Sequence, residues 1–147
     1  MDSLKDLPDH HDADLILRLY ELRREPTMRH SRDAMREFLP VTATEACEVL
    51  AKTHPLNAAW RQTTTYWEMV YGMARHGIVH PGYLLENSVE GLLLFAKVEP
   101  WLKELRAASS PRTVQNAEWA ATRTDAGRRL MEELRARVTK ARSARAS

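Results

Sequence analysis

Cysteine, long apolar runs and leader-like segments are the features that this 147-residue sequence lacks or has little of. Cys47 is the only cysteine, which excludes an intrachain disulfide and a zinc site built from cysteines. The most apolar run, residues 92–96, is far shorter than the roughly 20 residues that a membrane-spanning helix needs. The N-terminus has no basic region followed by an apolar stretch, so it predicts no secretory signal. These absences favour a soluble protein of the cytoplasm that does not enter a membrane.

Strict alternation of apolar and polar residues is also missing, as are the residue pairs typical of β-hairpin turns. Apolar residues instead recur at helical spacing in every long segment. A chain of this length can bury one core. The sequence therefore predicts an all-α fold, a single-domain bundle of five to seven helices over residues 1–147. The ends, residues 1–8 and 142–147, are expected to be flexible.

The bundle is expected to be organised around residues 57–106, as an antiparallel helical hairpin. Its first helix, residues 57–76, is apolar over most of its circumference, which is typical of a helix buried between others. Gly77 suits the left-handed conformation that ends such a helix, and Pro81 suits the start of the next one. Pro100 is expected to kink or break the second helix.

Shorter helices are expected on both sides of the hairpin. Before it, Pro26 separates a helix ending near residue 25 from one that ends before Pro40, and a short helix follows up to residue 53. After it, residues 111–141 form either two helices divided at Thr124 or one long bent helix. This C-terminal segment can pack on its own bundle or reach across to a second subunit.

No constellation in the sequence predicts a catalytic or metal site. The segment His10 to Asp14 offers imidazole and carboxylate groups, but an acidic helix start is the simpler interpretation. His76 and His80 are four residues apart, yet Gly77 ends the helix between them. The sequence therefore predicts no metal, no cofactor and no catalytic residue, and it disfavours an enzyme.

Four residues of the central helix are the candidate ligand-binding set: Trp60, Trp67, Glu68 and Tyr71. The aromatic side chains can line an apolar pocket, and a buried carboxylate with a raised pKa can act as an acid or a base. The alternative interpretation is structural: the aromatic residues form core, and Glu68 pairs with an arginine.

Basic residues concentrate in the last quarter of the chain. Residues 112–147 hold nine Lys and Arg against four Asp and Glu, a net charge of +5, whereas residues 1–111 carry −3. Such a helix can contact phosphates. Glu133 precedes Arg137 by four residues, however, which is typical of pairing on a helix surface, so a nucleic-acid partner is disfavoured.

Two short stretches resemble a family of bacterial helical proteins that are classed only as domains of unknown function. The first is Tyr66-Trp67-Glu68, followed by an apolar helix, Gly77 and an apolar restart, and the second is residues 116–121, Asn-Ala-Glu-Trp-Ala-Ala. The resemblance covers roughly the second half of the chain. It implies a helical bundle and brings no activity with it.

Three functions follow as hypotheses. The favoured one is a helical interaction module that self-associates, as a homodimer, or binds another protein, because large apolar residues lie on several faces of several helices. The second is a small-molecule binder or enzyme whose pocket lies beside the helix of residues 57–76. The third is nucleic-acid binding through the basic C-terminal helix.

Overall fold

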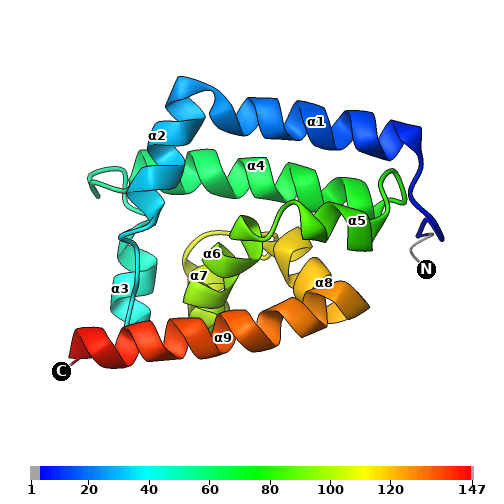
Figure 1. The fold of residues 1–147 in the computed structure, drawn as a ribbon. Coiled ribbons are helices and arrows are strands. Elements are labelled where there is room, and N and C mark those ends of the chain that lie inside the picture. The colour runs from blue at the N-terminus through cyan, green and yellow to red at the C-terminus, as the bar shows by residue number, and fades with distance from the viewer. Residues whose placement is uncertain (1–3, 147) are drawn as a thin grey trace.

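The computed structural model describes residues 4–146, and over this range the protein is all-helical, without a strand (Figure 1). The predicted helical bundle is confirmed. The elements are α1 (His10–Arg24), α2 (Pro26–Met35), α3 (Ala43–Glu48), α4 (Asn57–Arg75), α5 (Pro81–Glu86), α6 (Glu90–Val98), the 3₁₀ turn η1 (Glu99–Trp101), α7 (Leu102–Ala108), α8 (Gln115–Arg123) and α9 (Asp125–Ala146).

The described residues form nine α-helices, more than the five to seven expected, because the second arm of the hairpin is broken. Residues 87–89 separate α5 from α6, and the break at Pro100 is confirmed as the 3₁₀ turn η1. At the C-terminus the chain forms two helices, α8 and α9, divided at Thr124. The single domain over residues 1–147 stays a prediction. The flexibility of residues 1–8 and 142–147 also stays a prediction, and residues 1–3 and 147 lie outside the described range.

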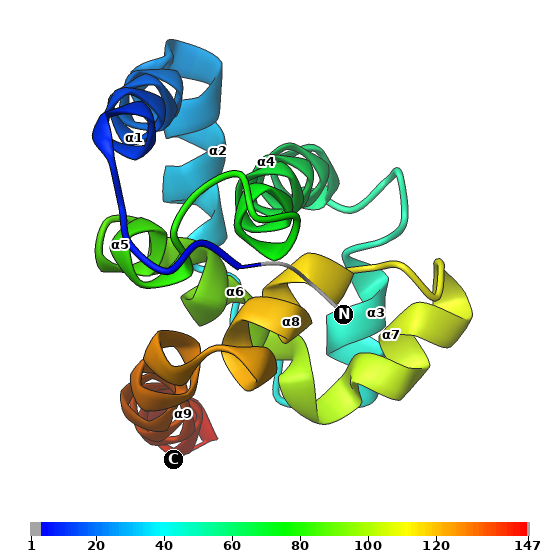
Figure 2. The same ribbon diagram turned by 90° about the vertical axis from the view of Figure 1, so that its right-hand side faces the viewer.

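The axes of α1, α4 and α9 are roughly parallel, with α4 running opposite to α1 and α9 (Figure 1), and Figure 2 views all three nearly end-on. The elements α5 to α8 lie between α4 and α9. In Figure 2, α1, α5 and α9 lie on one side of the molecule, and α3 and α7 lie on the other. Helix α4 is central because it packs chiefly against α2 and α8, and less against α5 and α6.

Helix α4 ends at the hairpin turn for the expected reason. Gly77 adopts a left-handed φ of 75°, and the N–H groups of Ile78 and Val79 both donate to the Met73 carbonyl, which closes α4. Further along, α6 crosses α4 at Gly91. A Cβ atom there would lie 2.7 Å from the Trp67 ring, so only glycine allows the two helices to approach this closely.

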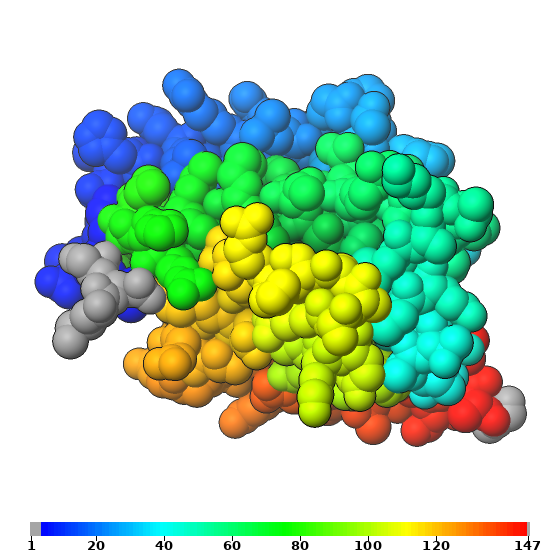
Figure 3. Space-filling view, turned by 180° about the vertical axis from the view of Figure 1, so that it is seen from behind, coloured from blue at the N-terminus to red at the C-terminus, as the bar shows by residue number. Residues whose placement is uncertain are grey.

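Helix α9 packs on its own bundle. Arg142 donates to the carbonyls of Pro40 and Lys97, at 3.1 and 2.6 Å, and its guanidinium lies over the Trp101 ring. Figure 3 shows the face on which α3, α7 and α8 gather, with α9 along its lower edge. Of the two arrangements that the sequence left open for this segment, packing within the same chain is the one observed.

Candidate functional site

The aromatic residues of the predicted ligand-binding set lie in the core. Trp60, Trp67 and Tyr71 are 4%, 3% and 0% exposed. The ring centroids of Trp67 and Tyr71 are 5.7 Å apart in a stacked arrangement, and the Tyr71 hydroxyl donates to the Ser88 carbonyl at 2.6 Å. Trp60 contacts Phe38 instead, with the ring centroids 5.7 Å apart. These contacts hold α4 against the segment that follows α2 and against the connection between α5 and α6.

Glu68 binds the start of another helix. Its two carboxylate oxygens accept from the backbone N–H groups of Asn116 and Ala117, at 2.8 and 2.9 Å, in the first turn of α8. Burial raises the pKa of the carboxyl group, and the two backbone hydrogen bonds oppose that shift. The four residues of the set therefore do not surround one common space, and a ligand-binding role for the whole set stays a prediction.

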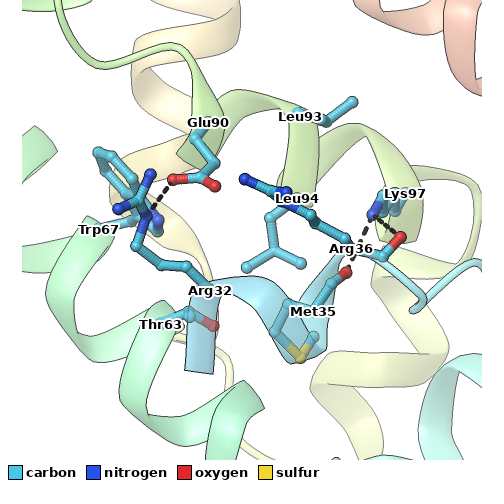
Figure 4. Close-up of a pocket in the computed structure, with 9 residues that line it drawn as sticks. All are labelled: Arg32, Met35, Arg36, Thr63, Trp67, Glu90, Leu93, Leu94 and Lys97. Carbon is cyan, nitrogen blue, oxygen red and sulfur yellow. Dashed lines mark hydrogen bonds and ion pairs between the residues drawn. The ribbon is translucent and has the colours of Figure 1, made fainter. Parts of the chain in front are cut away.

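Trp67 of that set borders a cavity. The cavity has a volume of about 40 Å³ and lies between α2, α4 and α6 (Figure 4). It is lined by Arg32, Met35, Arg36, Thr63, Trp67, Glu90, Leu93, Leu94 and Lys97. Five of these side chains, namely Arg32, Arg36, Glu90, Leu93 and Lys97, also line a larger neighbouring hollow.

That larger hollow, which we call the α6 groove, has a volume of about 680 Å³ and is bounded by α1, α2, α6 and α9. Its charged lining consists of five cations and one acid: Arg23, Arg32, Arg36, Lys97, Arg137 and Glu90. Its apolar lining consists of Leu39, Val89, Leu93, Leu134, Val138 and Ala141. The groove therefore combines an apolar floor with a strong excess of positive charge.

The single acid of the groove already has a partner. Glu90 accepts from Arg32 Nε at 2.7 Å, and Arg32 Nη1 also donates to the Arg23 carbonyl at 3.2 Å. Arg36 reaches only Asp33, at 3.6 Å, and both side chains are largely exposed. Arg137 is exposed and forms no hydrogen bond or ion pair within the described residues. The groove thus presents two exposed guanidinium groups, Arg36 with one long ion pair and Arg137 with none among the described residues.

Lys97 is the least expected member of the lining. It is 8% exposed, and its ammonium donates to the carbonyls of Met35 and Arg36, at 3.1 and 3.5 Å, at the end of α2. No carboxylate of the described residues lies within 4.0 Å of it. Burial lowers the pKa of Lys97 to about 8, helped by the charge of Arg137 and opposed by Glu90.

Arg23 is a second buried cation with unused donor capacity. It is 8% exposed, and its Nη1 donates to the Asn87 carbonyl at 2.9 Å, whereas Nε has no partner. Its guanidinium lies over the rings of Tyr20 and Trp67, at 5.5 and 5.6 Å from their centroids. Arg23 also lines an adjoining hollow that contains the exposed side chains of Leu17 and Tyr20.

The groove can bind an anion with an apolar body, and sequence reasoning did not find it. The signal available was Lys97, a lysine directly after the most apolar run of the chain. The histidine segment near residue 10 has a structural role instead: buried Asp12 accepts from Lys5 Nζ at 2.8 Å and from the His80 N–H at 3.3 Å. Among residues 4–146, no three His, Cys, Asp or Glu side chains are placed to hold a metal ion.

Within the part of the chain that the structure describes, no helix is both long and apolar enough to span a bilayer. Searches of curated proteins and of solved structures found no significant match. A family model, that of a domain of unknown function (DUF4760), matches residues 8–124. The match extends over most of the chain and not only over the second half, as the two short stretches had suggested. The chain therefore belongs to the DUF4760 family of domains of unknown function.

Proposed function

We propose that this protein is a helical interaction module whose α6 groove binds an acidic, amphipathic helix of a partner protein. The observation that carries the proposal is the lining of the groove, in which five cations and one acid surround an apolar floor. An apolar floor favours the apolar face of a partner, and the excess positive charge favours carboxylates on its flanks.

The arrangement of the floor supports a helical partner. Val89 just before α6 and Leu93 on α6, and Leu134 and Val138 on α9, are each four residues apart, so the two side chains of each pair lie on one face of their helix. Apolar side chains from two helices that line one hollow can receive the apolar face of a third, amphipathic helix. The role proposed is binding without catalysis.

Nucleic acid is the less favoured partner. Several arginines of the basic C-terminal helix are engaged within the chain: Arg135 with Glu99 at 2.7 Å, Arg145 with Glu45 at 2.8 Å, and Arg142 with two carbonyls. A phosphate backbone also leaves the apolar floor of the groove without a partner.

A synthetic peptide tests the proposal. The probe is a fluorescein-labelled helix of about 18 residues, long enough to be helical, with leucines at helical spacing and glutamates elsewhere. We expect it to bind in fluorescence anisotropy, and a peptide with the same residues in scrambled order to bind much more weakly. The double variant Arg36→Glu/Arg137→Glu should lose affinity about tenfold or more, because two exposed cations of the groove become acids.

The matched control is Arg18→Glu/Arg129→Glu. Both arginines are exposed and line no part of the groove, and the two double variants change the net charge of the protein by the same amount. Equal losses in the two double variants, or equal binding of the scrambled peptide, would contradict the proposal. Tighter binding of single-stranded DNA than of the peptide would favour the nucleic-acid alternative.

We also propose that the chain self-associates as a homodimer in the cytoplasm of a bacterium. Leu17 and Tyr20, three residues apart on α1, are 63% and 53% exposed, and such an apolar pair supports contact with a second protein surface. Native mass spectrometry at high micromolar concentration tests the homodimer. A strictly monomeric species contradicts it, and Leu17→Ser should shift a dimer toward the monomer.

A further inference from the structure

We propose that Lys97 is the anchor of the α6 groove and binds one carboxylate of the acidic partner helix, with the head of that carboxylate in the cavity beside Trp67. This inference rests on the proposed function and names the residue that recognises the partner's charge. Three observations carry it: the unused donor of Lys97, the position of Glu90, and the size of the cavity.

The first observation is the hydrogen bonding of Lys97. An ammonium group has three N–H donors, and two of them point at the carbonyls of Met35 and Arg36. The third has no acceptor within the described residues. Because Lys97 lines both the cavity and the groove, that donor is available to an acceptor that enters from the groove.

The second observation is that Glu90, the one acid of the groove, forms no ion pair with Lys97. Figure 4 shows Glu90 and Lys97 on opposite sides of the cavity, with Glu90 paired to Arg32. Of the charged groups that line the groove, Arg137 on α9 lowers the pKa of Lys97 and Glu90 on α6 raises it. A buried ammonium close to the Arg137 guanidinium, with only backbone carbonyls as its hydrogen-bond partners among the described residues, attracts an anion from outside the chain.

The third observation is the space itself. A cavity needs roughly 10–15 Å³ to hold one water molecule. A cavity of about 40 Å³ therefore has room for roughly three heavy atoms, the size of a carboxylate head. Its apolar lining, which includes Leu94 and Trp67, is less polarisable than water, which strengthens the attraction between opposite charges there.

A double-mutant cycle tests the anchor. A set of peptides is made from the probe above, in which each glutamate in turn is replaced by glutamine. Each is titrated against the wild type, against Lys97→Met and against the matched control Lys103→Met, which removes an exposed lysine on α7. Lys97→Met keeps an unbranched apolar stem of similar length, so the core around it stays filled.

We expect one glutamate position to be coupled to Lys97. Replacing that glutamate should weaken binding to the wild type and to Lys103→Met about tenfold, and should have no effect on binding to Lys97→Met. Loss of affinity spread evenly over all positions, and unchanged by Lys97→Met, would overturn the anchor. If Arg36→Glu/Arg137→Glu still weakens binding in that case, the proposed function stands and only this inference fails.

A second readout separates binding from a structural role. Nuclear magnetic resonance of the Lys97 side chain should show its pKa rising from about 8 when the peptide is added, because a bound carboxylate favours the charged ammonium. A Lys97 pKa that does not change on saturation with the peptide overturns the anchor. Failure of every peptide to bind overturns both the anchor and the proposed function.

Discussion

At the scale of single residues, Lys97 makes the stability of the protein depend on pH. Its pKa is about 8 in the folded protein and 10.5 in an unfolded chain, so the unfolded state binds more protons between these values. The cost of burying the charge is therefore fully present below pH 8 and is relieved as the pH rises toward 10.5. The folded protein should become relatively more stable across that window.

The prediction is a comparison between the wild type and Lys97→Met. Relative to this variant, the free energy of unfolding of the wild type should increase by about 1–2 kcal/mol between neutral pH and a pH of about 9.5. Urea denaturation at both pH values measures it, and groups such as Tyr71, which both proteins share, cancel. A constant difference between the two proteins would contradict the prediction.

The sequence identifies Glu68 as a candidate residue but does not predict which groups it binds. Its place among aromatic residues marked it as a candidate, but the groups that it binds, the N–H groups of Asn116 and Ala117, lie 48 and 49 residues further along the chain. Sequence spacing carries no information about such a contact. A side chain that receives the start of a distant helix is found only once the helices are placed.

Replacing Glu68 should therefore loosen α8. Glu68→Ala leaves two part-buried N–H donors without their acceptor and should lower the free energy of unfolding by about 1–2 kcal/mol. Glu68→Gln retains one acceptor oxygen and should cost less, and Glu21→Ala, at an exposed acid of α1, should have little effect. Amide hydrogen exchange at Asn116 and Ala117 should accelerate in Glu68→Ala, and unchanged exchange there would contradict the role.

At the scale of helices, local signals predicted some boundaries and distant contacts decided others. Gly77 and Pro100 act through their own backbone, so the end of α4 and the break at η1 could be predicted. The break between α5 and α6 could not, because the carbonyls of residues 87 and 88 are bound from far away. Arg23 donates to the Asn87 carbonyl and Tyr71 to the Ser88 carbonyl, which holds this segment outside a helix.

The packing of α9 on the rest of the bundle should depend on the specific contacts of Arg142 more than on the overall positive charge of the helix. Arg142 donates to two carbonyls and stacks on Trp101, with its guanidinium 4.8 Å from the ring centroid. Arg142→Ala should lower the free energy of unfolding by about 1–2 kcal/mol, through lost hydrogen bonds and packing. Arg129→Ala, at an exposed position of the same helix, should cost less than about 0.5 kcal/mol. Equal effects in thermal denaturation would contradict this role.

At the scale of the whole molecule, helical periodicity predicted the fold class, but the distribution of charge along the sequence did not predict the α6 groove. The helical periodicity sufficed for an all-α bundle, since each helix buries its own apolar stripe. The count of charges pointed to the C-terminal quarter, yet Arg23, Arg32, Arg36 and Lys97 of the α6 groove come from residues before it. Folding gathers cations from α1, α2, α6 and α9 into one place, and no stretch of sequence is basic enough to reveal this.

The same gathering of charge predicts how binding should respond to salt. If the groove, and not the net charge of +2, attracts the acidic peptide, raising the salt concentration should weaken binding to the wild type and to Arg18→Glu/Arg129→Glu with similar steepness. Arg36→Glu/Arg137→Glu should show a shallower dependence, although it carries the same net charge as that control. The measurement is the dissociation constant of the labelled peptide by anisotropy from low to moderate salt. If the dissociation constant depended equally steeply on salt in all three proteins, the attraction would come from the charge of the molecule as a whole. That result would contradict binding of the peptide in the α6 groove.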